Sequence, residues 1–123
     1  MFKQHLTSLT KHMTDSGMTF TPLPSIKLIH NDEENAQELL GRTAYYEPQS
    51  SCIVLYTKGR HPKDVLRSFA HEMIHHMQNL EGRLNHVDTT NVNEDENLYQ
   101  LELEAYSLGN MLFREWENSI KND

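Results

Sequence analysis

Residues 71–75 of the chain read His-Glu-Met-Ile-His, an HExxH pattern inside a run whose apolar residues recur with helical spacing. Two histidines four positions apart on a helix lie one turn above the other, so both imidazoles can reach a single metal ion. Zinc that is held by two histidines and a carboxylate, with one coordination position open, is a hydrolytic site. The pattern therefore predicts His71 and His75 as zinc ligands.

Glu72 has the residue type and the position of a general base. It points to a neighbouring flank of the helix, where it can touch a metal-bound water without being a ligand. Zinc lowers the pKa of its bound water to about 7, and a carboxylate beside that water removes its proton as the water attacks a carbonyl group. The alternative is an accidental pattern of solvated helix residues in a chain rich in histidine and glutamate.

The helix that carries the pattern is expected from about Pro62 to Leu80, with Gly82 just past its end. Proline suits the first helical position because its missing N–H is not needed there, and glycine commonly follows a helix. Both histidines fall on the side opposite an apolar stripe, which favours a site over an accident. The stripe consists of Leu66, Phe69, Met73, Met77 and Leu80.

The third ligand must come from another element, and a long final helix offers Glu102 and Glu104. Its apolar face runs from Leu98 to Trp116, and residues 93–96 fit a capping box at its start. Glu102 lies close to the apolar face, whereas Glu104 lies on its other flank. A glycine in line with Glu102 would let the two helices approach closely. The spacing favours Glu102 and leaves Glu104 as the alternative; the residues in line with Glu102 are Tyr106, Gly109 and Phe113.

Four further residues have side chains that suit a supporting role. His76 points about 100° away from the second histidine of the pattern, which indicates a surface or supporting residue rather than a ligand. His86, in a loop expected over residues 83–92, could contact a substrate. Tyr106 is expected as a catalytic residue that donates a hydrogen bond to a tetrahedral intermediate. Tyr99 is expected to pack at the seam between the helices.

The residues before the pattern predict a helix and a small sheet. Apolar spacing favours an amphipathic helix over residues 2–14, and Ser25–His30 is β-prone. A short helical turn is expected at Ala36–Leu40. The segments Arg42–Tyr46 and Cys52–Thr57 are expected to form a hairpin, because a proline and serines separate them.

Composition limits the remaining possibilities. The chain has 123 residues, enough for one domain, and a net charge of −7, which argues against a large nucleic-acid interface. Its single cysteine, Cys52, excludes an internal disulfide and is expected to be a small core residue in a strand. No apolar run suits a signal peptide or a membrane span. The expectation is a cytoplasmic protein without nucleic-acid or membrane partners.

The sequence resembles a minimal zinc metallopeptidase of the gluzincin kind. HExxH is typical of zincins, and residues 102–109 (Glu-Leu-Glu-Ala-Tyr-Ser-Leu-Gly) are similar to the ExEAxxFA-type segment of the ImmA/IrrE family. The related shape ExxAD recurs in membrane-bound Ste-type zinc proteases. The first glutamate of the segment is the third zinc ligand in both, which the resemblance assigns to Glu102. Tyr106 stands where those families usually have Asn or Asp.

A looser resemblance covers the upstream residues. Gly41, Tyr45–Pro48 and Ile53–Leu55 are similar to the small sheet before the active-site helix of SprT-like and ImmA-like domains. The resemblance implies that an edge strand of this sheet holds the substrate backbone by strand addition. The compact size would suit a phage-encoded protein acting in the host cytoplasm.

The sequence as a whole predicts a single α+β, zincin-like domain over residues 1–123, with a small, mostly antiparallel sheet packed on the active-site helix and a long C-terminal helix. The predicted function is a zinc-dependent metallopeptidase, an endopeptidase rather than an exopeptidase, acting on a protein or peptide substrate. A zinc-bound binding or regulatory module of the same fold is the alternative. The expected zinc ligands are His71, His75 and Glu102, and the expected catalytic residues are Glu72 and Tyr106.

Overall fold

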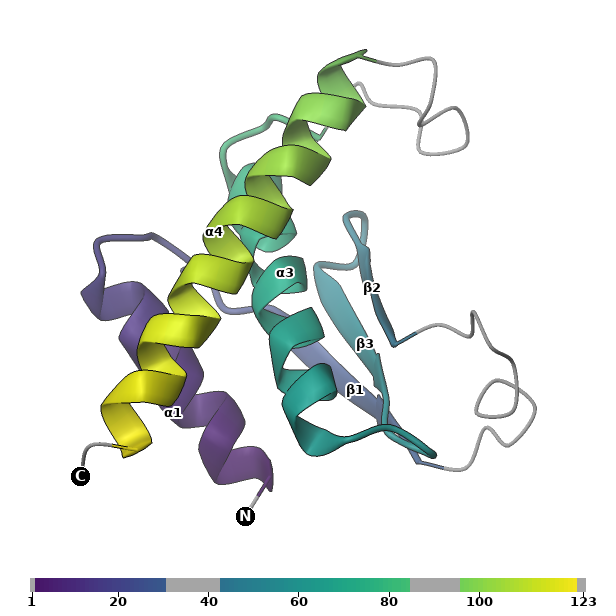
Figure 1. Cartoon of the computed structure of the whole chain (residues 1–123). Coiled ribbons are helices and arrows are strands. Elements are labelled where there is room, and N and C mark those ends of the chain that lie inside the picture. Colours follow the sequence, from purple (N-terminus) through teal and green to yellow (C-terminus); the bar gives the residue numbers. More distant parts are fainter. Residues whose placement is uncertain (1, 31–42, 85–95, 122–123) are drawn as a thin grey trace.

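Three helices lie on one side of a small sheet in the computed structural model of the chain, which describes residues 2–30, 43–84 and 96–121 (Figure 1). This arrangement confirms the α+β class, and the helices and strands lie close to the bounds expected from the sequence. Among the described residues, no helix combines the length and the apolar character needed to cross a bilayer. In chain order the elements are α1 (Phe2–Asp15), β1 (Ser25–Ile29), β2 (Ala44–Glu47), β3 (Cys52–Tyr56), α3 (Pro62–Leu80) and α4 (Glu96–Lys121).

The sheet has three strands in the order β1-β3-β2. β2 and β3 form the expected antiparallel hairpin, in which Ala44 pairs with Leu55 and Glu47 pairs with Cys52. β1 pairs with β3 in parallel. The expectation of a mostly antiparallel sheet is therefore wrong, because the sheet is mixed. Parallel pairing needs a connection of about a dozen residues or more, and the stretch between β1 and β3, which includes β2, is long enough.

α3 lies between the sheet on one side and α1 and α4 on the other (Figure 1). Leu66, Phe69 and Met73 of the expected stripe are buried, whereas Leu80 at the C-terminal end of the helix is 37% exposed. The buried surface is wider than the stripe because α3 has neighbours on two sides. Each large side chain buried in this way contributes about 1.5–3 kcal/mol. The additional buried apolar residues of α3 are Val65, Ala70 and Ile74.

Both ends of α3 follow from local chemistry. His61 precedes the helix, and its Nδ1 accepts a hydrogen bond from the backbone N–H of Lys63 at 3.0 Å. Pro62 is the first helical residue, as expected. Gly82 adopts a left-handed φ of 76° just past the end, and its N–H donates to the carbonyl of Asn79. Glycine adopts this conformation without the steric cost that a side chain would bring.

Several expected features lie outside the described residues. They are the helical turn at 36–40, the side chains of the capping box at 93–96, and most of the 83–92 loop with His86. Cys52 does begin β3, but its side chain is partly exposed, so the expectation of a core residue is wrong.

The backbones of α3 and α4 touch at Gly109. A Cβ atom at this position would lie 3.0 Å from the Cα of His71 and 3.3 Å from the carbonyl carbon of Ala70. Both are backbone atoms of a packed helix, so neither can move aside alone. The close approach expected of Gly109 is confirmed, and it occurs beside the first histidine of the HExxH pattern.

We expect Gly109→Ala to destabilise the protein by about 1–3 kcal/mol, because the added methyl group would overpack the contact. In an unpacked helix the same change would stabilise by about 1 kcal/mol, so the sign of the effect reports the contact. Urea denaturation followed by circular dichroism measures it. Ser107→Ala, at an exposed position of the same helix, is the control. A Gly109→Ala protein as stable as the parent would contradict the prediction.

Candidate metal centre

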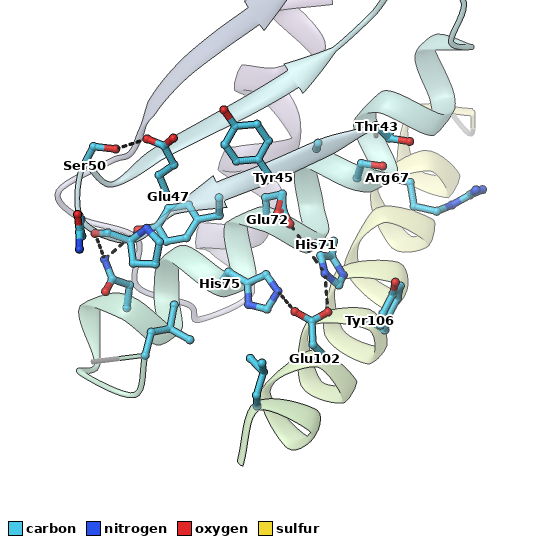
Figure 2. Close-up of a pocket in the computed structure, with 18 of the residues that line it drawn as sticks. Thr43, Tyr45, Glu47, Ser50, Arg67, His71, Glu72, His75, Glu102 and Tyr106 are labelled. Carbon is cyan, nitrogen blue, oxygen red and sulfur yellow. Dashed lines mark hydrogen bonds and ion pairs between the residues drawn. The ribbon is translucent and has the colours of Figure 1, made fainter. Parts of the chain in front are cut away.

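Three side chains converge between α3 and α4 (Figure 2). His71, His75 and Glu102 each offer one ligand atom, and these atoms lie within 4.8 Å of one another. The Oε1 atom of Glu102 lies 2.8 Å from Nε2 of His75, and its Oε2 atom lies 3.4 Å from Nε2 of His71. The residues expected as ligands from the sequence are thus brought together, although they come from two helices.

The donor set suits zinc. Two imidazoles and one carboxylate are characteristic ligands of a zinc site that keeps a fourth position open. Zinc–ligand bonds of about 2.0–2.2 Å would hold neighbouring donor atoms roughly 3–3.6 Å apart. The Glu102–His71 separation of 3.4 Å falls within that range, and the shorter Glu102–His75 separation is that of a direct hydrogen bond.

The local charges favour a cation at this point. Hydrogen bonds with His71 and His75 hold the pKa of the Glu102 carboxyl well below its usual range. Burial lowers the pKa of His75, but its hydrogen bond with Glu102 and the nearby negative charges outweigh burial and raise it. The ionised carboxylate therefore attracts positive charge to the place where the two imidazoles meet.

Glu72 lies beside the three donors without joining them. Its side chain is buried, and its Oε1 atom lies 3.9 Å from Nε2 of His71. Its Oε2 atom is buried and has no hydrogen-bond partner among the described residues. Burial raises the pKa of this carboxyl, although the two histidines oppose the shift. A buried carboxylate oxygen without a partner is costly for stability and indicates a functional role.

Gln78 supports the centre and was not assigned a role from the sequence. Its Nε2 donates to the carbonyl of Leu101 at 3.0 Å and to Glu104 at 2.9 Å, so its Oε1 atom must accept from Nδ1 of His75 at 2.8 Å. Because Gln78 holds a proton on Nδ1, it is Nε2, which donates to Glu102 in this structure, that would lose its proton and give its lone pair to a metal. The available signal was spacing, because Gln78 follows His75 by three positions on the same face.

Glu104 has other partners. The guanidinium of Arg83 donates to its Oε1 atom at 2.8 Å, and Gln78 donates to the same atom. Burial raises the pKa of the Glu104 carboxyl, but these hydrogen bonds outweigh burial and lower it. Of the two glutamates considered from the sequence, the one whose carboxylate reaches both histidines is Glu102.

The two tyrosines of α4 behave differently from each other. The ring of Tyr106 contacts that of His71 at a tilt of 58°, with ring centroids 4.4 Å apart, and Tyr106 remains 58% exposed beside the site. Its catalytic role stays a prediction. Tyr99 is 55% exposed, so the expectation that it packs between the helices is wrong. Tyr99 lies near the start of α4, where spacing along the helix does not show whether α3 covers a side chain.

His76 is fully buried, so of the two roles expected for it the surface one is wrong. Its Nε2–H donates to the carbonyls of Pro22 and Phe20, at 2.7 Å and 3.3 Å. Its Nδ1 therefore accepts from the hydroxyl of Tyr46, at 2.8 Å. The residue ties α3 to β2 and to the segment before β1.

Asn79 extends this network to the wall of the cleft. Its Nδ2 donates to the hydroxyl of Tyr46 and to the carbonyl of Pro48, each at 3.0 Å. Because Pro48 follows β2, these bonds fix the strand at a set distance from α3.

The centre lies in an open cleft of about 1270 Å³. Residues 43–50, which include β2, form one wall, and α3 and α4 form the others. Figure 2 shows Thr43 and Arg67 at one end of the cleft and Glu47 and Ser50 at the other, with the metal ligands between them. The cleft therefore extends to both sides of the site.

Comparison of the chain with protein-family models, with curated proteins and with solved structures gives no match. The geometry of the cleft therefore carries the functional interpretation, and the resemblance to gluzincins remains an expectation.

We expect the purified protein to bind one zinc ion per chain, measured by elemental analysis after metal loading and desalting. His71→Ala, His75→Ala and Glu102→Gln should each leave less than stoichiometric zinc, because each removes one of three ligands. Glu104→Gln should remain loaded. Loss of zinc from Glu104→Gln together with retention by Glu102→Gln would contradict the ligand assignment.

We expect Gln78→Met to weaken zinc binding by about 10- to 100-fold, because it removes the acceptor that orients His75 while nearly conserving volume. Competition with a chromophoric chelator measures the dissociation constant. Asn79→Ala, which leaves the His75 contact intact, is the control. An unchanged dissociation constant in Gln78→Met would show that the hydrogen bond does not support the ligand.

Proposed function

We propose that the protein is a zinc-dependent metallopeptidase with a zincin-like fold, which hydrolyses peptide bonds in a protein or peptide substrate. The observation that carries this proposal is the position of Glu72. Its buried carboxylate lies beside the three converging ligand atoms, with one oxygen that no described residue hydrogen-bonds. An arrangement that served only to hold a metal would not need this carboxylate.

Zinc held by His71, His75 and Glu102 would polarise a carbonyl oxygen and acidify a water. Glu72 takes the proton of the attacking water and then delivers it to the leaving amine. Burial raises the pKa of Glu72, which suits this exchange because it makes the carboxylate a stronger base toward the water. Its separation of 3.9 Å from Nε2 of His71 keeps it adjacent to the ligands.

Two other residues complete the proposed machinery. The exposed phenol of Tyr106, whose ring contacts His71, is able to donate a hydrogen bond to a developing oxyanion at the mouth of the site. Gln78 holds the His75 ring in one orientation through its Nδ1.

The cleft wall supports a peptide as the substrate. Within residues 2–30, 43–84 and 96–121, β3 is the strand that pairs with β2, and no described strand lies on the other edge of β2, where an extended chain could add. The cleft continues to both sides of the ligands, which favours cleavage within a chain over removal of a terminal residue. The single cysteine is compatible with action in a reducing cytoplasm.

We expect Glu72→Gln to lower peptidase activity by about 10²- to 10⁴-fold with zinc content unchanged, because the amide keeps the shape of the carboxylate but cannot accept the proton. Cleavage of an unfolded protein, followed by mass spectrometry, measures the activity. Glu115→Gln, at an exposed position of α4, is the control. Full activity in Glu72→Gln would overturn the mechanism. A zinc-loaded parent that cleaves nothing would favour a binding module of the same fold.

A further inference from the structure

We propose that the end of the cleft at the start of α3 is a carboxylate-binding subsite formed by Arg67 and Asn110. It would bind an acidic group of the substrate on one side of the bond that is cleaved. The inference rests on the proposed peptidase function and names the substrate chemistry that this function selects. The acidic group is either an Asp or Glu side chain or the C-terminal carboxylate of the chain.

Arg67 and Asn110 each lie one helical turn from a residue of the proposed site. Arg67 precedes His71 by four positions on α3, and Asn110 follows Tyr106 by four positions on α4. Residues with this spacing are neighbours on one helix face, with Cβ atoms about 5–6 Å apart. Because the contact at Gly109 brings the two helices together here, Arg67 and Asn110 line the same end of the cleft.

Charge makes this end distinct. Among the described residues that line the cleft, Arg67 is the single lysine or arginine, whereas Glu47, Glu72 and Glu102 are acidic. Figure 2 shows Glu47 at the opposite end. A substrate carboxylate is repelled by these acidic residues and attracted by the guanidinium. The two ends of the cleft therefore differ in charge, and this difference would fix the orientation in which an acidic peptide binds.

The contacts of Arg67 hold its side chain and use one of its five donors, in a long hydrogen bond from Nη1 to Asp64. Its Cζ atom lies 5.4 Å from the ring centroid of Phe113, which draws the guanidinium toward α4. Its recorded ion pair, with Asp64, is long at 3.4 Å and exposed, so it contributes little. A guanidinium has five donors in a planar fork that matches a carboxylate, and an amide beside it adds another.

The other acidic neighbour is already engaged. The positive charge of Arg67 is among the causes that lower the pKa of Glu117. The main cause is the hydrogen bond with Lys63, whose Nζ lies 2.9 Å from the Glu117 carboxylate. Glu117 is therefore a poor competitor for the guanidinium. Asp64 is the remaining competitor, and its removal offers a control.

The test uses a position scan of labelled heptapeptides of small apolar residues. One Glu occupies each position in turn, a second set has Gln in its place, and every peptide is made with a free and with an amidated C-terminus. Cleavage is measured with the zinc-loaded parent, and binding is measured by fluorescence anisotropy with zinc-loaded Glu72→Gln. Binding thus remains measurable even if the protein is not a peptidase.

We expect one Glu position, or the free C-terminus, to improve binding and kcat/KM by about tenfold over the neutral counterpart, as for a hydrogen bond between charged groups. Arg67→Gln should abolish this ratio, Asn110→Ala should reduce it, and Arg67→Lys should restore part of it. Asp64→Asn should keep or increase it. Dependence on Glu position identifies a side chain as the ligand, and dependence on amidation identifies the C-terminus.

Failure of the subsite and failure of the function have different outcomes. Cleavage without preference for an acidic group, or a preference that survives Arg67→Gln, would overturn the subsite and leave the peptidase intact. Arg67-dependent binding of acidic peptides by a protein that cleaves none of them would support the subsite and overturn the peptidase function.

Discussion

The contact between the backbones of α3 and α4 at Gly109 is the constraint on which the site depends. Ligands from two helices can share one ion only if the helices are close, and a side chain at this position would collide with the backbone of His71. Glu102 lies two turns before Gly109 on the same helix, so the contact also sets how far its carboxylate reaches. The position of the third ligand is therefore a result of packing and not of local sequence alone.

The same helical turns of α3 carry residues of the hydrophobic core and residues of the candidate site. Its apolar residues pack on both sides, while Glu72, His75, His76 and Gln78 are buried with them. Burial of polar groups is tolerated when they are hydrogen-bonded. Gln78 and His76 satisfy this condition toward opposite neighbours, Gln78 toward α4 and His76 toward β2. On α3 the exceptions among the described residues are Nδ1 of His71 and Oε2 of Glu72, and Glu72 is the residue whose proposed chemistry needs a free oxygen.

The spacing of residues along single helices and strands made much of the secondary structure predictable. The bounds of α3, the β2–β3 hairpin and the closeness of Glu102 to the two histidines agree with what residue spacing predicted, whereas the role of Glu102 as a ligand stays a prediction. The parallel pairing of β1 and the burial of His76 depend on which elements become neighbours, and spacing does not contain that information. Gln78 was identifiable as a neighbour of His75, but its role depends on the carbonyl of Leu101 and on Glu104 of another helix.

The edge of β2 that faces away from β3 has no strand beside it among the described residues, and this has a consequence for the protein in isolation. An edge that could accept a substrate strand could equally pair with the same edge of another copy, a common route to aggregation. β2 limits this risk because it has four residues and ends at the charged Glu47, immediately before Pro48. Its shortness leaves few backbone hydrogen bonds for self-association. A short edge also gives little affinity for any strand, so side-chain contacts elsewhere in the cleft must provide the rest.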